Sequence, residues 1–147
     1  MLARLSPLRA RVALAAAALA VAALAAPAAH ADDKSYTLVT DGSSSSVKVG
    51  ADGKFALHIK PAAGYHVNKE GPFKIVLSGD RVKPAIEKLE RKHAKDGDVE
   101  SPRFEVALKG LEAGAGKLQA DATFVICSET VCERRVEKLA LAVDVKP

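Results

Sequence analysis

The two cysteines of the chain, Cys127 and Cys132, are the residues whose type and spacing most directly suggest chemistry. Four residues separate them, and alternating apolar residues lead into the pair from Leu118 and away from it toward Val145. This pattern predicts two antiparallel strands with the cysteines at the mouth of the connecting turn. Paired positions of a hairpin bring Cα atoms within bridging distance, so we expect that these two thiols can form a disulfide.

A disulfide at this place can be structural or can exchange with other thiols, and the residues alone do not decide between the two roles. As a structural bridge it closes a loop of about six residues, which on the chain-entropy model stabilises the fold by only about 2 kcal/mol. Strand alternation puts Cys127 on the side of Thr123, opposite the apolar Phe124, so its sulfur is expected to lean toward solvent. An accessible bridge in a small loop is the kind that exchanges with other thiols.

The charged residues near the pair act in opposite directions on a thiolate. Arg134 and Arg135 favour thiolate formation, whereas Glu129 and Glu133 oppose it. The residues alone do not fix whether these charges together favour or oppose the thiolate. A structural bridge and an exchanging bridge remain alternatives.

The remaining polar residues give weaker signals of a site. The two cysteines with His66 or His93 could bind zinc or copper, but the sequence has no Cys-x-x-Cys and its histidines are scattered. The acidic residues at 96–100 do not have the spacing of a calcium loop. The sequence contains no nucleophile elbow, phosphate-binding glycine loop or catalytic carboxylate pair. His58 falls on the polar side of an alternating run and is expected to be solvated, and we predict no metal and no cofactor.

The N-terminal residues 1–31 have the layout of a secretory signal peptide. Three arginines precede an uncharged apolar run from Val12 to Ala26, and Ala29 and Ala31 provide the small residues of a cleavage site. The run is shorter than the roughly 20 residues that a membrane-spanning helix needs. We therefore expect cleavage after Ala31 and export to the periplasm, where disulfides persist.

The mature chain, residues 32–147, has the size of one domain. The leader contains three of the 22 basic residues and none of the 18 acidic ones, so the mature chain has one more basic than acidic residue. This balance gives no reason to expect nucleic acid as a partner. We expect no membrane span in the mature chain, and a monomer.

Short alternating runs separated by turn residues fill most of the mature chain. We expect strands at 36–40, 47–49, 55–60, 65–68, 73–77, 103–108, 118–127 and 139–145. The Asp52-Gly53 pair between two of these runs predicts a hairpin turn. Residues 82–95 fit a short surface helix and an irregular charged crossover equally well. Seven or eight short strands predict an all-β, immunoglobulin-like β-sandwich, with an open barrel as the alternative.

Three segments together resemble a known family: residues 59–68 (IKPAAGYHVN), residues 102–108, and residues 116–132 with the cysteine pair. They are similar to the N-terminal periplasmic domain of the bacterial thiol:disulfide interchange protein DsbD, over about residues 47–145. The resemblance implies an immunoglobulin-like fold with Cys127 and Cys132 as the redox pair. It also implies that Cys132 forms the mixed disulfide with a partner.

Members of that family pass electrons between proteins, so the resemblance implies periplasmic or membrane thiol-disulfide oxidoreductases as partners. The sequence differs from the family in two places. Glu133-Arg134-Arg135 stands where proline often follows the second cysteine, and residues 91–103 lack the aromatic side chains of the loop that shields the family's pair.

The sequence therefore supports two functional hypotheses. The first is a periplasmic thiol-disulfide exchange module that passes electrons through Cys127 and Cys132 to or from partner oxidoreductases. The alternative is a non-catalytic, exported immunoglobulin-like interaction module whose hairpin disulfide is structural.

Overall fold

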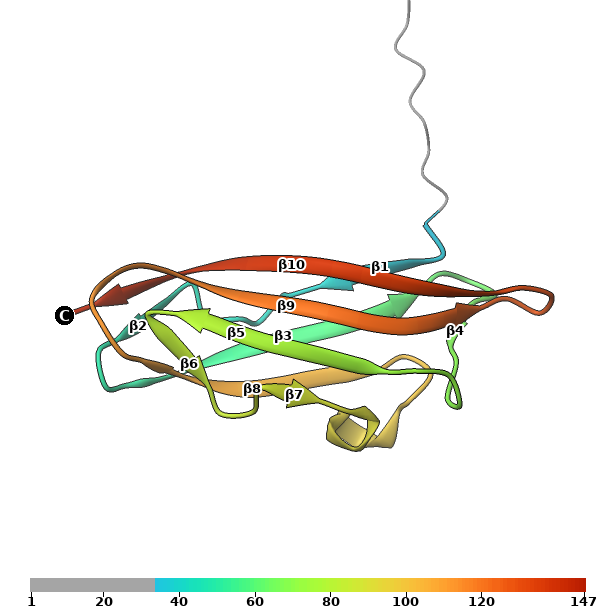
Figure 1. Cartoon of the computed structure of the whole chain (residues 1–147), viewed down its shortest axis with the longest axis horizontal. Coiled ribbons are helices and arrows are strands. Elements are labelled where there is room, and N and C mark those ends of the chain that lie inside the picture. Colours follow the sequence, from blue (N-terminus) through green and yellow to red (C-terminus); the bar gives the residue numbers. More distant parts are fainter. Residues whose placement is uncertain (1–33) are drawn as a thin grey trace, which may run out of the picture. The chain divides into compact units, whose positions relative to one another are not determined.

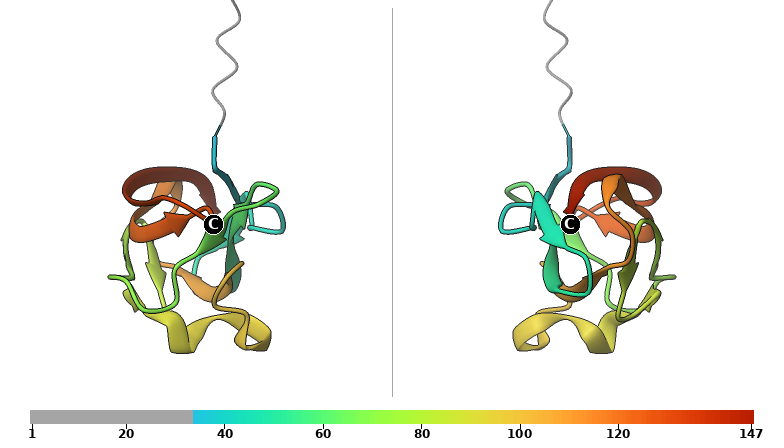
Figure 2. Two further views of the ribbon diagram at one scale, coloured as in Figure 1. Left: turned by 90° about the vertical axis from the view of Figure 1, so that its right-hand side faces the viewer. Right: turned by 90° about the vertical axis from the view of Figure 1, so that its left-hand side faces the viewer.

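The computed structural model describes residues 34–147, and the predicted signal peptide lies outside the described residues. Ten β-strands and two short 3-10 helices form this part of the chain. The strands make two sheets that pack face to face, as Figures 1 and 2 show. Within residues 34–147, no helix has the length and apolar character needed to cross a membrane.

The first sheet has four strands in the order β1-β3-β8-β6. Their bounds are β1 (Tyr36–Val39), β3 (Asp52–Pro61), β8 (Arg103–Gly110) and β6 (Val82–Pro84). All three pairings are antiparallel. Burial alternates along β8, where Phe104, Val106 and Leu108 face the core, as the alternation in the sequence predicts.

The second sheet has the order β2-β10-β9-β5-β7, with β4 paired to the end of β9. Its strands are β2 (Ser46–Lys48), β10 (Cys132–Lys146), β9 (Gly114–Cys127), β5 (Lys74–Asp80), β7 (Lys88–Leu89) and β4 (His66–Val67). The long β9–β10 hairpin is antiparallel from the Cys127–Cys132 pair to the Gly114–Val145 pair. Strand β2 joins the end of β10 in parallel.

The strand order is that of an immunoglobulin-like sandwich. The orders β1-β3-β8-β6 and β10-β9-β5 correspond to the ABED and GFC sheets of immunoglobulin domains. The chain changes sheets between β1 and β2, so that β2 lies beside β10. The all-β prediction is confirmed. The count of seven or eight is exceeded because the structure adds β6 and β7, two short strands within residues 82–95, where the sequence predicted no strand.

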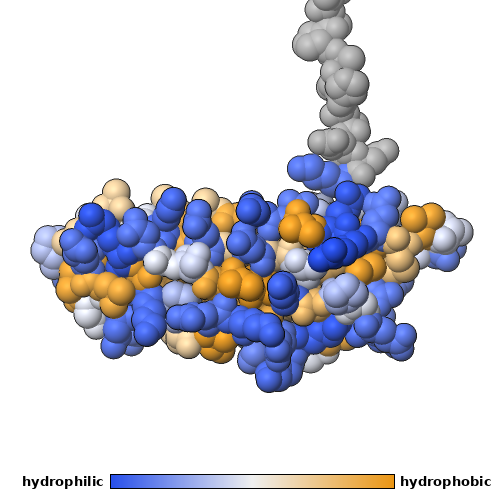
Figure 3. All heavy atoms as spheres, viewed as in Figure 1, coloured by the Kyte–Doolittle hydropathy of each residue, from blue (hydrophilic) through white to orange (hydrophobic). Residues whose placement is uncertain are grey.

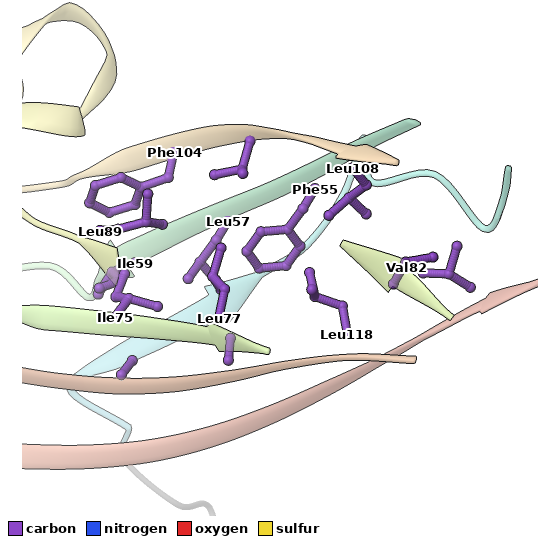
Figure 4. Close-up of a cluster of buried hydrophobic side chains, with 14 of the residues drawn as sticks. Phe55, Leu57, Ile59, Ile75, Leu77, Val82, Leu89, Phe104, Leu108 and Leu118 are labelled. Atoms are coloured by element: carbon purple, nitrogen blue, oxygen red, sulfur yellow. The ribbon is translucent and has the colours of Figure 1, made fainter. Parts of the chain in front are cut away.

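The core between the sheets is built from aliphatic side chains and a few phenylalanines. Phe55, Phe104 and Phe124 are each at most 1% exposed. Figure 4 shows Phe55 and Phe104 among leucine and isoleucine side chains that come from both sheets. The Tyr36 ring meets the Phe124 ring edge to face, with centroids 4.9 Å apart.

The predicted hairpin turn at Asp52-Gly53 is wrong. Both residues lie in β3, and the strands on either side of the expected turn belong to different sheets. The chain reverses instead at Gly50, whose φ of +76° favours glycine. A Cβ on Gly53 would lie 2.4 Å from Cγ2 of Val47, so this glycine serves close packing against β2.

Residues 82–95 form a crossover and not an α-helix. The segment contains β6, β7 and the 3-10 turn Arg91–His93, followed by a second 3-10 turn, Lys95–Gly97. Leu89 is buried in the core from β7, whereas Ile86 remains exposed. The apolar residues at helical spacing therefore do not share one face.

Candidate functional site at the disulfide-bridged hairpin

The two cysteines form a disulfide at the neck of the β9–β10 hairpin. They are paired residues in the register of the two strands, as the sequence predicts. The backbone N–H of Ser128 donates to the carbonyl of Val131 at 2.8 Å and closes the loop beyond the bridge. Figure 1 shows this loop extending past the neighbouring loops at one end of the sandwich.

The two halves of the bridge differ in exposure. Cys127 is 2% exposed, whereas Cys132 is exposed on the surface. Cys127 lies between two strands, because it pairs with Cys132 on one side and with His66 of β4 on the other. Its predicted position on the outer face of β9, opposite Phe124, is confirmed, but the expected exposure of its sulfur is wrong.

The segment that covers Cys127 is the loop from Asn68 to Gly71. The backbone N–H of Asn68 donates to the carbonyl of Val125 at 2.8 Å, which ties the start of the loop to β9. A Cβ on Gly71 would lie 3.0 Å from Cγ2 of Val125, so the loop packs closely on the outer face of the strand. This cover comes from residues far earlier in the chain, which strand alternation could not reveal.

Asn68 makes the polar contact to the bridge. Its Nδ2 donates to Cys127 Sγ at 3.4 Å. Its Oδ1 accepts the backbone N–H groups of Glu70 at 2.8 Å and Gly71 at 2.7 Å. The sequence Asn68-Lys-Glu-Gly71 is a signal for this kind of turn, but nothing in the sequence connects the turn with the cysteines.

Arg91 holds the covering loop from the other side. Its guanidinium donates to the carbonyl of Asn68 at 2.9 Å and to the carbonyl of Gly71. It also lies 5.3 Å from the centroid of the Phe73 ring. The stretch that contains Arg91 lacks Phe, Tyr and Trp, and it supports the cover through this cation.

The charges that follow Cys132 are divided between the two faces of β10. Alternation places Arg134 on the same face as Cys132, and Glu133 and Arg135 on the other. Arg135 pairs with Glu133 and lies 6.0 Å from the centroid of the Tyr36 ring. Of the two arginines that could favour a thiolate, Arg134 is therefore the one on the cysteine face.

On the inner side of β10, the Tyr36 hydroxyl donates to the carboxylate of Glu137. Burial, and then the hydrogen bond to Glu137, raise the pKa of Tyr36 above its ordinary value of 10.0. This contact joins the first strand of one sheet to the last strand of the other.

A recess of about 370 Å³ opens beside the hairpin loop. It is lined by Ser35, Tyr65, Ile126, Ser128, Thr130, Val131, Glu133 and Arg135. Tyr65 is 42% exposed and Val131 is 55% exposed. Among the residues that line the recess, Ser35 Oγ and Arg135 Nε are buried without a hydrogen-bond partner. Figure 3 shows hydrophobic and hydrophilic atoms side by side at this end of the molecule.

The other candidate residues from the sequence are not brought together. His66 pairs with Cys127 in the sheet, while His93 accepts the backbone N–H of Glu90 through Nδ1. Residues 34–147 contain no group of three or more His, Cys, Asp or Glu side chains arranged to hold a metal ion. Asp98 instead accepts the backbone N–H groups that follow it, at Glu100 and Ser101.

His58 is not freely solvated as expected. It is half-buried, and its Nε2 lies 2.8 Å from Ser101 Oγ. Burial, followed by the positive charges of Arg103 and Lys60, lowers the pKa of His58 below its ordinary value of 6.5.

Comparison with known proteins assigns no family. No family model matches the chain, and no curated protein matches it. Among solved structures, domains 4 and 5 of the S-layer protein SbsC align with 15% identity and a TM-score of 0.41, over 76% of this chain and 51% of that one. Domains 5–6 of SbsC align with 15% identity and a TM-score of 0.39, over 74% and 42%. The matches thus span about half of those structures or less, and scores this low carry no argument about function.

Proposed function

We propose that this domain is a non-catalytic, exported interaction module in which the Cys127–Cys132 disulfide fixes the projecting hairpin. The observation that carries the proposal is the burial of Cys127, which is 2% exposed. A cysteine held between β10 and β4, and covered by the loop that begins at Asn68, is part of the packing at this end of the sandwich. The formed bridge also fits an exported protein, because disulfides persist in oxidising compartments.

The contact surface of this module is the end of the sandwich that carries the bridged loop. In immunoglobulin variable domains, the loops between strands B and C and between F and G form the binding surface. The corresponding loops here contribute Tyr65 and Val131, which are both exposed. An exposed aromatic ring, an exposed aliphatic side chain and the exposed polar residues Thr130 and Glu133 supply the mixed apolar and polar chemistry of a protein contact.

A redox titration tests the structural role of the bridge. The purified domain is equilibrated with mixtures of reduced and oxidised glutathione and dithiothreitol, and its free thiols are then alkylated and counted by mass. A structural bridge stays oxidised down to about −300 mV. A midpoint near that of glutathione itself would contradict the structural role and favour the second function below.

The second candidate function is thiol-disulfide exchange with periplasmic or membrane oxidoreductases. One observation favours it: Cys132 is exposed, so one sulfur of the pair belongs to a surface residue. Exchange needs access to one sulfur only, because the other leaves as the bond breaks. The resemblance to the DsbD N-terminal domain implies the same function and the same attacked cysteine.

A trapping experiment separates exchange from the interaction module. The Cys127→Ser variant, secreted to a bacterial periplasm, retains Cys132 as its one thiol and should form mixed disulfides with oxidoreductases if exchange occurs. Cys132→Ser is the matched control, since its remaining thiol is the buried Cys127. Absence of any Cys132-dependent adduct with an oxidoreductase would exclude exchange.

A further inference from the structure

Asn68 is placed to control how the Cys127–Cys132 bond opens. A thiolate that opens a disulfide forms a bond with one sulfur and expels the other. Cys132 is exposed and Cys127 is 2% exposed, so attack falls on Cys132 Sγ. The sulfur that leaves, with the electron pair of the broken bond, is then Cys127 Sγ.

A thiolate released at a buried position is costly unless a donor stabilises it. Asn68 Nδ2 lies 3.4 Å from Cys127 Sγ and donates to it. A hydrogen bond to the charged form of a group favours that form. The donor is already in place while the bond is intact, so no rearrangement is needed when the charge appears.

The orientation of the Asn68 amide follows from its other contacts. Its Oδ1 accepts two backbone N–H groups, those of Glu70 and Gly71. A flipped amide would place two N–H donors against these backbone donors, so the flip is excluded by the network. Nδ2 must therefore face the sulfur, and the loop holds it there.

We infer that Asn68 is a positioning residue for thiol attack on this bridge, because it stabilises the Cys127 thiolate that leaves when Cys132 is attacked. In the first step the glutathione thiolate bonds to Cys132 Sγ, and the Cys127–Cys132 bond breaks. The electron pair stays on Cys127 Sγ, which later takes a proton from water. A second glutathione then attacks the mixed disulfide, and the products are the dithiol and oxidised glutathione.

This inference goes beyond the interaction module and concerns the chemistry that the second candidate function would use. It applies to any attacking thiol, whether or not the cell supplies one. Its test therefore measures the rate of opening and the ionisation of Cys127, while the redox titration measures the equilibrium of the bridge. A low potential with an Asn68-dependent rate would support both the structural role and this inference.

The sharpest variant is Asn68→Asp. Aspartate keeps an oxygen to accept the N–H groups of Glu70 and Gly71, but it replaces the donor at the sulfur with a charged acceptor. Gln119→Glu is the matched control, because it makes the same change from amide to carboxylate at an exposed position on β9, the strand of Cys127. Urea unfolding of each variant checks that the fold is retained.

Two measurements decide the outcome. The rate of opening by glutathione should fall by about tenfold in Asn68→Asp and stay unchanged in Gln119→Glu. In a Cys132→Ser background, the midpoint of thiolate formation at Cys127, followed at 240 nm, should rise by about one pH unit or more with Asn68→Asp. Equal rates and equal midpoints in the two variants would overturn the inference.

A measurement on the unaltered protein covers the case in which Asn68→Asp does not fold. The glutathione adduct that forms first is quenched in acid, alkylated and mapped by peptide mass spectrometry. Glutathione is expected on Cys132, with the alkyl group on Cys127. Glutathione found mainly on Cys127 would overturn the inference, since Cys127 would then be the attacked sulfur.

Discussion

Cys127 and Cys132 occupy opposite positions of one hairpin, yet the first is 2% exposed and the second lies on the surface. Both side chains belong to the outer face of the sheet, so the hairpin alone gives no reason for their different exposure. The difference arises from the neighbours, because β4 and the loop at Asn68 cover Cys127 alone. In this disulfide, Cys127 is therefore packed under neighbouring segments, whereas Cys132 lies at the surface.

The first prediction concerns the stability that the bridge supplies. Replacing both cysteines, as Cys127→Ala/Cys132→Ala, should lower the free energy of unfolding by about 2 kcal/mol, because the bridge closes a loop of about six residues. Urea unfolding of the variant and the oxidised parent measures the loss. Reduction of the parent without substitution is the control for the lost volume of the buried cysteine. A loss well above that size on reduction would mean that the bridge supports more than its own hairpin.

The second prediction concerns the cover over Cys127. Gly71→Ala should destabilise the protein by about 1 kcal/mol, because the new Cβ meets Val125 at 3.0 Å. The reduced Cys127 should also react faster with a thiol reagent as the loop lifts. Adding Val125→Ala removes the Cγ2 contact and leaves only the Cβ contact at 3.2 Å, so the double variant should recover most of the slow reaction. A single variant with unchanged stability and reactivity would show that the loop does not pack as described.

The third prediction concerns Tyr36 and alkaline pH. Because burial and the Glu137 carboxylate raise the pKa of Tyr36 in the folded state, the folded protein holds this proton more tightly than the unfolded chain does. The stability from this contact is complete below pH 10 and should be lost progressively as the pH rises above it. Tyr36→Phe should flatten that part of the profile, while Tyr65→Phe, at an exposed position, should not. Urea midpoints between pH 9 and 11 give the comparison, and parallel profiles for parent and Tyr36→Phe would contradict it.

The fourth prediction concerns His58 and acidic pH. Burial and the neighbouring Arg103 and Lys60 lower the pKa of His58 in the folded state, so the unfolded chain binds this proton more readily. The contribution of neutral His58 is present above pH 6.5 and should be lost as the pH falls below that value. His58→Gln should reduce the slope of stability against pH in this range, as measured by thermal unfolding. An unchanged slope would assign the acid sensitivity to other groups.

Alternation and spacing in the sequence predicted the larger strands and the cysteine pair well. The run at 103–108 lies in β8, and the two flanks of the cysteines became β9 and β10 with Cys127 opposite Cys132. These elements follow from local patterns of period two, which a single sequence displays directly. The Asp52-Gly53 prediction was wrong because the glycine there makes room for Val47 of a strand in the other sheet.

By itself, the sequence determined an all-β chain, the phase of each long strand and the partner of each cysteine, because these depend on residues close together in the chain. Only the tertiary structure decided the exposure of Cys127 and the donor on its sulfur. The covering Asn68 is separated from Cys127 by 59 positions, and its contact with the sulfur exists only once β4 has paired with β9. Burial depends on such distant neighbours, and no local pattern near a residue records which segment will lie over it.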